Sequence, residues 1–266
     1  MKRGRGLQRL ILGVVVFDLL FLALPTLVIV VASFTAGKIV AFPPEGFSLR
    51  WYQAILDKRA FVDAFLRSAY VATVCTLVSL PAGTLAALAL ARWRLRHALA
   101  WQLYLLLPFT IPLVVSGLGM MLLFGRMGML GMLWPVGLAL TVINLPFMIW
   151  GVAACVNRLD PDLENAAANL GAPPLHAFVT VTLPAVMPGV VTGGLLMFIL
   201  AFNEFIVSLM LVDARTVTLP VLMYNSIRST ITPDLAALSV VYILIAAVTV
   251  WLLDRLVGLE TFLRSR

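Results

Sequence analysis

Charged residues are scarce in this chain. They make up 12% of its 266 residues, whereas 62% are hydrophobic, and the mean hydropathy is +1.05. Soluble globular domains carry about 25% charged residues, and disordered chains combine low hydrophobicity with high net charge. The composition therefore excludes both classes and indicates a polytopic membrane protein. We expect a single transmembrane domain over residues 1–266, since this length leaves no room for a second sizeable soluble domain.

Cysteine and histidine are also rare. The two cysteines, Cys75 and Cys155, lie inside apolar runs and have no Cys-x-x-Cys spacing, which is typical of buried small side chains. The two histidines, His97 and His176, lie between apolar runs, and the chain contains no His-Glu-x-x-His pattern. The sequence therefore predicts no disulfide framework and no metal site.

Nucleotide-binding and catalytic motifs are missing as well. Gly37-Lys38 is followed by Ile39, and no complete Gly-x-x-x-x-Gly-Lys-Ser/Thr phosphate loop is present. The apolar runs contain one aspartate and one glutamate on different predicted helices and no histidine, so they lack a catalytic constellation at a common depth. We expect a protein that is not an enzyme and that binds no cofactor itself.

Six apolar stretches are long enough to cross a bilayer, which takes roughly 20 residues. Four of them contain no charged residue, the first contains only Asp18, and the fifth contains only Glu204. Gly189 and Gly193 form a small-residue pattern in the fifth, for which close helix packing is a sufficient explanation. The predicted spans cover about 10–33, 68–91, 98–124, 130–156, 186–212 and 235–253.

The basic residues predict the orientation of these spans. They lie between the apolar runs, so the net charge of +7 reflects membrane topology rather than binding to nucleic acid. With the N-terminus inside, eleven of the 19 Lys and Arg residues lie inside and eight lie outside. The run over 10–33 is longer than the core of a signal peptide, which has about 7–15 apolar residues. We therefore expect an uncleaved N-terminal anchor and both termini inside.

The segment between the fourth and fifth spans, residues 157–185, is longer than a simple connector. Asp160 is a suitable N-cap and Pro161 a suitable first helical residue, while Gly171 and the prolines after it favour a stop. The spacing predicts a helix over about 161–170, then a second short helix that begins at Pro174 and ends at Pro184. Four apolar residues share one face of the first helix: Leu163, Ala166, Ala167 and Leu170.

This apolar face has two interpretations. A stripe of small apolar residues suits insertion into a groove on another protein. Alternatively, the stripe packs against the ends of the chain's own spans. Both interpretations can hold for different residues, and the sequence leaves them open.

The same segment resembles the EAA loop of the permease subunits of ABC importers. The family pattern is Glu-Ala-Ala, three residues, Gly, nine residues, Ile, one residue and Leu-Pro. The matching residues are Ala166, Ala167, Gly171, Leu183 and Pro184, with Val181 in place of Ile. Asn165 replaces the acidic residue of the pattern, and Glu164 lies one position earlier. Phe47–Tyr52, Ile111-Pro112 and Phe202–Phe205 are similar to segments of spermidine/putrescine-type permeases.

The resemblance implies a type I ABC-importer permease fold, which is all-α with six transmembrane helices and a cytoplasmic coupling-helix hairpin between spans 4 and 5. It implies a bacterial inner-membrane protein, surrounded by lipid, that works with a second homologous permease, two ATPase subunits that hold ATP and Mg²⁺, and an extracytoplasmic solute-binding protein. The residues it assigns to ATPase coupling are Glu164, Asn165, Ala166, Ala167, Leu170, Gly171, Leu183 and Pro184.

The resemblance makes a polyamine the first candidate for the transported solute. Other small solutes stay open, namely 4-aminobutyrate or another amino acid, a phosphonate, or ferric iron. A stand-alone channel or secondary transporter is the alternative outside this class. Polar residues in the spans are the candidates for the solute path: Glu204, Asn203, Asn144 and Asp18. Glu204 could instead pair with a partner subunit or hold the outer gate.

Overall fold

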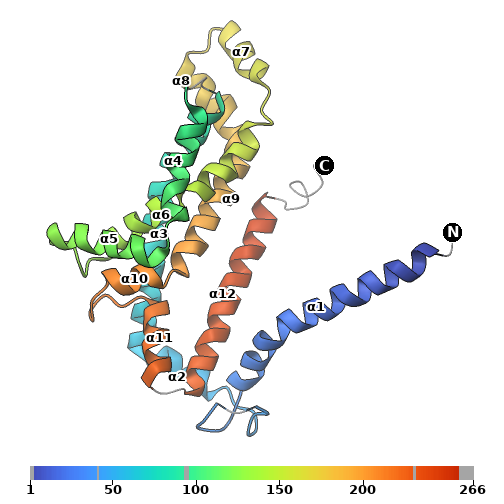
Figure 1. Ribbon diagram of the computed structural model, residues 1–266, viewed down its shortest axis with the longest axis vertical. Coiled ribbons are helices and arrows are strands. Elements are labelled where there is room, and N and C mark those ends of the chain that lie inside the picture. Colours follow the sequence, from blue (N-terminus) through green and yellow to red (C-terminus); the bar gives the residue numbers. More distant parts are fainter. Residues whose placement is uncertain (1–2, 41, 93–95, 230–231, 258–266) are drawn as a thin grey trace. The chain divides into compact units, whose positions relative to one another are not determined.

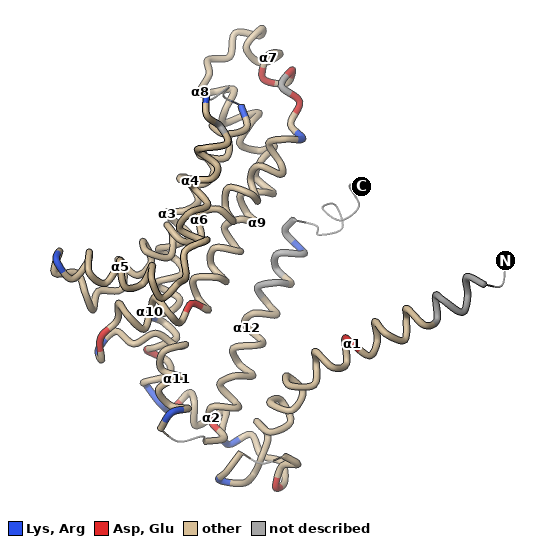
Figure 2. Tube along the Cα trace, viewed as in Figure 1, with Lys and Arg blue, Asp and Glu red and all other residues tan. Residues whose placement is uncertain are grey.

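The computed structural model describes residues 3–40, 42–92, 96–229 and 232–257. Within these ranges the protein is helical, apart from one isolated antiparallel bridge between Thr35 and Phe47. Charged residues gather in loops and at helix ends, and the long helices are almost uncharged (Figure 2). This distribution suits helices that cross a membrane, where charged side chains are costly.

The chain divides into two compact units. Unit 1 comprises Met1–Val62 and Met223–Ile245, and unit 2 comprises Asp63–Leu222 and Ala246–Arg266. Residues 1–2 and 258–266, at the two termini that we expect inside, lie outside the described residues.

Unit 1 is built on α1 (Arg3–Ser33), α2 (Arg50–Asp57) and the first part of α12 (Pro233–Val257) (Figure 1). The end of α1 is fastened to α2, because Ser33 Oγ and Tyr52 OH lie 2.6 Å apart. The indole Nε1 of Trp51 also donates a hydrogen bond to the carbonyl oxygen of Thr35, at 2.9 Å. These contacts hold the short helix α2 against the end of a membrane-length helix.

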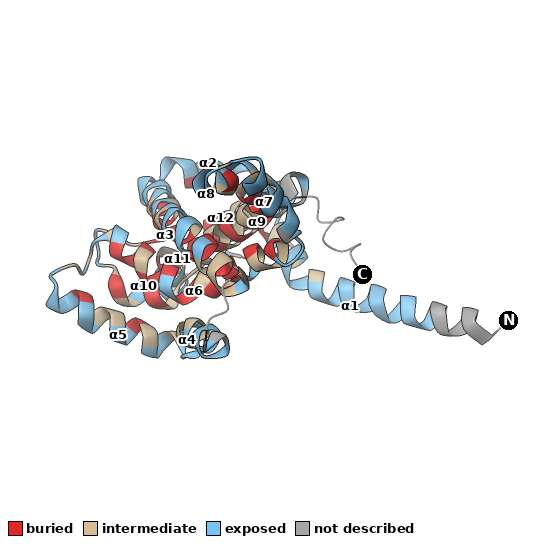
Figure 3. Ribbon diagram, turned by 90° about the horizontal axis from the view of Figure 1, so that it is seen from above, coloured by how far each residue is buried: buried red, intermediate tan, exposed pale blue. Residues whose placement is uncertain are grey.

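Unit 2 carries the larger core, which lies along α3, α6 and α9 (Figure 3). Its fully buried side chains include Val71, Cys75, Leu140, Met148, Val186 and Met197. Its helices are α3 (Arg59–Arg92) from Asp63 onward, α4 (Ala98–Thr110), α5 (Leu113–Arg126), α6 (Leu133–Val156), α7 (Pro161–Asn169), α8 (Pro174–Ala177), the π-helical turn η1 (Phe178–Thr182), α9 (Leu183–Phe202), α10 (Ile206–Leu211) and the start of α11 (Leu219–Ser229).

Helices α6 and α9 approach closely at their glycines. A Cβ atom placed on Gly189 would lie 2.5 Å from the carbonyl oxygen of Gly151, and one on Gly193 would lie 2.6 Å from Met148 Sδ. Neither glycine could carry a larger side chain without a shift of its neighbours. The interpretation of Gly189 and Gly193 as a close-packing pattern is confirmed.

Among the described residues, four helical stretches are long and apolar enough to cross a membrane: Leu10–Ser33, Arg59–Arg92, Leu133–Val156 and Pro174–Phe202. The pair Leu99–Thr110 and Leu113–Arg126 adds a fifth if it is counted as one span. The sixth predicted span, 235–253, falls on α12, of which Pro233–Val248 is an apolar stretch among the residues searched. An all-α membrane protein is confirmed, and the count of six spans stays a prediction.

The third predicted span, 98–124, is not one continuous helix. Helices α4 and α5 meet at an angle of 91°. Pro112 has no backbone N–H to continue α4, and it disfavours the helical conformation for the residue before it. Ile111 accordingly has φ −73° and ψ 135°. The break therefore follows from the Ile111-Pro112 sequence.

The fifth predicted span, 186–212, has different bounds in the structure. The helical stretch begins at Pro174 and ends at Phe202, and Asn203–Phe205 separate it from α10. The prediction that Pro184 ends the second short helix is wrong, because the chain continues through η1 into α9. Pro184 lies in the first turn of α9, directly after the wider π turn, where a missing N–H is tolerated.

Candidate functional site

The segment after α6 folds into the expected helix–turn–helix hairpin. Asp160 is the N-cap of α7, and its Oδ1 accepts a hydrogen bond from the backbone N–H of Asp162 at 3.0 Å. Pro161 is the first residue of the helix, Asn169 is the last, and Leu170 is the C-cap. Gly171 has φ +84°, a left-handed conformation that favours glycine. The predicted helix over 161–170 is confirmed to within one residue.

The apolar stripe of the hairpin is largely uncovered within this chain. Leu170 is 89% exposed, Leu175 is 75% exposed, and Leu163 is 51% exposed. Figure 3 shows α7 and α8 mostly in the colour of exposed residues. Ala177 in α8, which is not one of the four stripe residues, is buried within the chain. The most exposed apolar residues are therefore those nearest the turn at Gly171.

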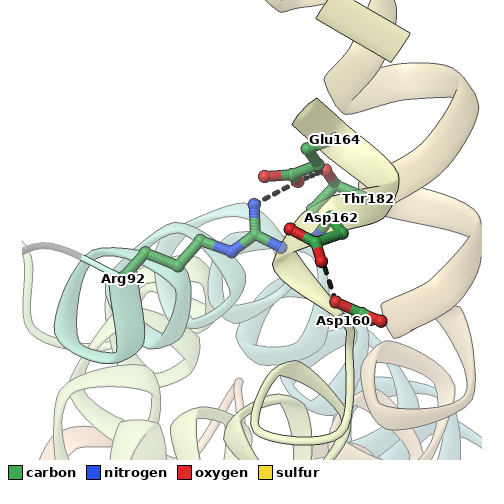
Figure 4. Close-up of polar contacts among 5 residues, drawn as sticks. All are labelled: Arg92, Asp160, Asp162, Glu164 and Thr182. Carbon is green, nitrogen blue, oxygen red and sulfur yellow. Dashed lines mark hydrogen bonds and ion pairs between the residues drawn. The ribbon is translucent and has the colours of Figure 1, made fainter. Parts of the chain in front are cut away.

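Glu164 anchors α7 to two other elements. Its Oε1 accepts a hydrogen bond from Arg92 Nη1, within an ion pair, and another from Thr182 Oγ1 (Figure 4). Arg92 is the last residue of α3, and Thr182 is the last residue of η1. The hydrogen bond from Arg92 and, less strongly, that from Thr182 lower the pKa of Glu164, against the opposing effect of burial. Glu164 is therefore held as a carboxylate between α3 and η1.

Sequence reasoning did not find the two partners of Glu164. Arg92 contributed only to the prediction of orientation, and Thr182 had no assigned role. Arg92 and Glu164 are 72 residues apart, and Thr182 follows Glu164 by 18. No local pattern in a single sequence connects residues at such separations.

The other predicted coupling residues lie on the same hairpin or at the start of α9. The Nδ2 of Asn165 donates a long hydrogen bond of 3.4 Å to Asp162 Oδ1, so Asn165 stays on the surface of α7. Ala166 is exposed, Ala167 and Leu183 are half-buried, and Pro184 is exposed. All eight residues, namely Glu164, Asn165, Ala166, Ala167, Leu170, Gly171, Leu183 and Pro184, thus lie on the hairpin or in the first two residues of α9.

The four residues predicted for the solute path lie on different elements. Glu204 lies between α9 and α10, and its carboxylate accepts hydrogen bonds from the backbone N–H of Val207 at 2.8 Å and of Ser208 at 2.9 Å. The hydroxyl of Ser208 lies 3.1 Å from the same carboxylate. Glu204 therefore caps the start of α10 instead of lying within a continuous span.

The remaining three residues belong to three different helices. Asn203 is the C-cap of α9, and its Nδ2 donates to the carbonyl oxygen of Ile199 at 2.8 Å. Asn144 is buried within α6. Asp18 is an exposed residue of α1 and belongs to unit 1, whereas the other three belong to unit 2. Asn203 and Glu204 are neighbours in the chain, whereas Asn144 lies on another helix of the same unit.

The chain matches known transport proteins over most of its length. The family described as "Binding-protein-dependent transport system inner membrane component" matches residues 79–259. The putrescine transport system permease protein PotI of Escherichia coli (strain K12) is 32% identical over 228 residues, which cover 82% of this chain and 80% of PotI.

Two further relatives are named for solutes other than putrescine alone. The spermidine/putrescine transport system permease protein PotC of Haemophilus influenzae is 26% identical over 226 residues, 85% of this chain and 88% of PotC. The molybdenum transport system permease protein ModB of Mycobacterium tuberculosis is 32% identical over 231 residues, 79% of this chain and 87% of ModB.

Among solved structures, a bacterial alginate ABC transporter in complex with its alginate-bound periplasmic protein has a chain of similar fold. The TM-score is 0.74 at 15% sequence identity, and the match covers 96% of this chain and 94% of that one. The protein is therefore a multi-pass, non-enzymatic permease subunit of an ABC importer, and it belongs to the family of binding-protein-dependent transport system inner membrane components.

Proposed function

We propose that this permease imports a small cationic solute, with a polyamine such as putrescine as the first candidate. The similarity to PotI and PotC carries this choice. ModB is as similar as PotI in sequence identity, and this favours another small solute as the second candidate. The extracytoplasmic binding protein would select between them, because it captures the solute before the permease meets it.

The hairpin would couple ATP hydrolysis to this import. Exposed Leu170 and Leu175 on either side of Gly171 offer an apolar surface of the kind that inserts into a groove on a partner. That partner would be an ATPase subunit that holds ATP and Mg²⁺. In the complete importer, two such ATPases and a second homologous permease would join this chain.

The hairpin also supports the orientation with both termini inside. An ATPase works on ATP in the cytoplasm, so α7 and α8 would lie on that side. Arg92 at the end of α3 and Arg158 after α6 lie at the same end of unit 2 as the hairpin. Basic residues favour the cytoplasmic side of a membrane.

Glu204 and Asn203 would lie on the solute path. An ionised carboxylate offers about four lone-pair directions, and Val207 and Ser208 occupy three of those of Glu204. One acceptor direction is left for an ammonium group of the solute. Asn144 and Asp18 would contribute at other points along the path.

Purification of the tagged chain from its native membrane tests the proposal. An ATPase with a phosphate loop and a second polytopic permease should co-purify, and the reconstituted complex with its binding protein should take up radiolabelled putrescine only with ATP. Uptake of another solute with ATP would retain the importer and replace the polyamine. A chain that purifies alone and moves solute in ATP-free liposomes would overturn the coupling role.

A further inference from the structure

The contact between Arg92, Glu164 and Thr182 joins three elements of unit 2. Glu164 lies on α7, Arg92 ends α3, and Thr182 ends the π turn η1 that leads into α9 (Figure 4). One carboxylate oxygen accepts both hydrogen bonds. A movement of α7 would therefore pull on α3 and on α9 together.

Thr182 is more deeply buried than the side chains of Arg92 and Glu164. Thr182 is 1% exposed, whereas the side chains of Arg92 and Glu164 are 27% and 28% exposed. Hydrogen bonds to a charged carboxylate are stronger than those between neutral groups, and partial burial limits screening by water and salt. The contact is thus more than a flexible surface ion pair.

Thr182 lies where the π turn η1 joins α9, so a movement of Glu164 acts on α9 at its start. Its hydroxyl lies at the end of a five-residue π turn, and Pro184 follows two residues later. A π turn has one more residue per hydrogen-bonded loop than an α-helix and occurs often at functional sites. The hydrogen bond to Glu164 therefore fastens α7 to the point where η1 passes into α9.

We infer that Arg92 and Thr182 are positioning residues for ATP-driven transport, which act through Glu164 to make α7, the end of α3 and the start of α9 move as one rigid lever. This inference rests on the proposed coupling role of the hairpin. It assigns functions to two residues whose identity the EAA-like pattern does not specify. It also gives Glu164 a partner within its own chain.

Three variants remove the lever without removing the hairpin: Arg92→Ala, Thr182→Val and Glu164→Gln. Matched controls change neighbours that lie outside the contact. Arg96→Ala removes an exposed arginine that follows α3. Thr180→Val removes a hydroxyl that donates to the carbonyl oxygen of His176, and Asp162→Asn changes a second acidic residue of α7.

The first measurement is the ratio of putrescine uptake to ATP hydrolysis in the full importer with its binding protein, in liposomes. The lever variants should bind the ATPase and hydrolyse ATP, while uptake per ATP falls about fivefold or more, the lower end of typical coupling between sites. The controls should keep the wild-type ratio. Wild-type ratios in both Arg92→Ala and Thr182→Val, or loss of ATPase binding in them, would overturn the inference.

The second measurement does not depend on transport. Spin labels at Asn169→Cys on α7 and Ala91→Cys on α3, in a chain whose Cys75 and Cys155 are replaced by alanine, report the distance between the two helices. Both labelled positions are exposed. The distance distribution should broaden in Arg92→Ala and in Thr182→Val, and stay narrow in Arg96→Ala. An unchanged distribution would contradict the lever, whereas a wild-type importer that takes up no solute with ATP would contradict only the proposed function.

Discussion

The ammonium group of Lys58 lies 2.5 Å from Oδ2 of Asp234, across 176 residues of sequence. The Asp234 side chain is 3% exposed, whereas that of Lys58 is 54% exposed. The pair joins the residue before α3 to the first turn of α12 within unit 1. The buried carboxylate of Asp234 depends on one half-exposed cation. Loss of that cation should therefore destabilise the fold.

Replacement of Lys58 by alanine should destabilise unit 1. The variant leaves the Asp234 carboxylate buried without its cation, and the loss of a hydrogen bond to a charged group costs about 2 kcal/mol. The melting temperature in detergent, followed by size-exclusion chromatography after heating, should fall. Lys38→Ala, at an exposed lysine of the same unit, should melt like the wild type. Equal melting temperatures for Lys58→Ala and Lys38→Ala would contradict the prediction.

The contribution of this pair should depend on pH in one direction. Burial by itself would raise the pKa of Asp234, but hydrogen bonds from Lys58 and Thr232 outweigh it, so the pKa lies below its usual value. A carboxyl group with a lowered pKa in the folded state stabilises the protein above its unfolded pKa of about 3.9 and loses this effect as the pH falls further. In Lys58→Ala burial acts without the cation, so the carboxyl group protonates more easily there. The difference in melting temperature between wild type and Lys58→Ala should therefore be largest near about pH 8 and shrink as the pH falls towards about 5. A difference that grows as the pH falls would contradict this direction.

The close approach of α6 and α9 predicts that a single added methyl group at Gly189 lowers the stability of the protein. The Cβ atom of Gly189→Ala would overlap the carbonyl oxygen of Gly151 at 2.5 Å, so the two helices must separate. Overpacking of this kind costs about 1–3 kcal/mol, and the melting temperature should fall. Gly119→Ala is the matched control, because no atom lies within 4 Å of the added Cβ in α5. A Gly189→Ala variant as stable as Gly119→Ala would mean that the helices do not approach this closely.

The turn of the hairpin predicts a graded series at Gly171. No atom lies within 4 Å of an added Cβ, so the cost of a side chain comes from φ +84° and from the docking surface. L-residues pay about 1–2 kcal/mol in the left-handed region, and asparagine adopts it more readily than most. Gly171→Leu should reach the membrane and lose uptake per ATP, while Gly171→Asn should retain most of it. Substrate-stimulated hydrolysis and uptake at wild-type levels in Gly171→Leu would refute the coupling role of this turn.

Two variants separate the proposed contact of Glu204 with the solute from its contacts as a helix cap. Glu204→Gln removes the charge and one acceptor oxygen, whereas Ser208→Ala removes one hydrogen bond and leaves the charge. If the carboxylate meets an ammonium group of the solute, Glu204→Gln should raise the KM for putrescine about tenfold, as expected for the loss of one charged hydrogen bond. Ser208→Ala should leave KM near the wild-type value. The same KM for putrescine in Glu204→Gln and Ser208→Ala would mean that Glu204 acts only as a helix cap.

The sequence by itself determined the features that depend on composition or on neighbouring residues. The low charge and the apolar runs indicated a membrane protein, because a bilayer tolerates few charged side chains. Asp160 and Pro161 at one end and Gly171 at the other defined α7, since capping and left-handed turns are decided within a few residues. The Ile111-Pro112 break likewise has a local cause.

The tertiary structure alone decided the contacts between distant residues. Lys58 meets Asp234, and Arg92 meets Glu164, only because the fold brings elements that are far apart in the chain into contact within a unit. The end of α9 at Phe202 has a local cause instead, because Glu204 caps α10 through the backbone N–H groups of Val207 and Ser208. Hydropathy records which segments avoid water, whereas side-chain pairing depends on the geometry with which those segments pack.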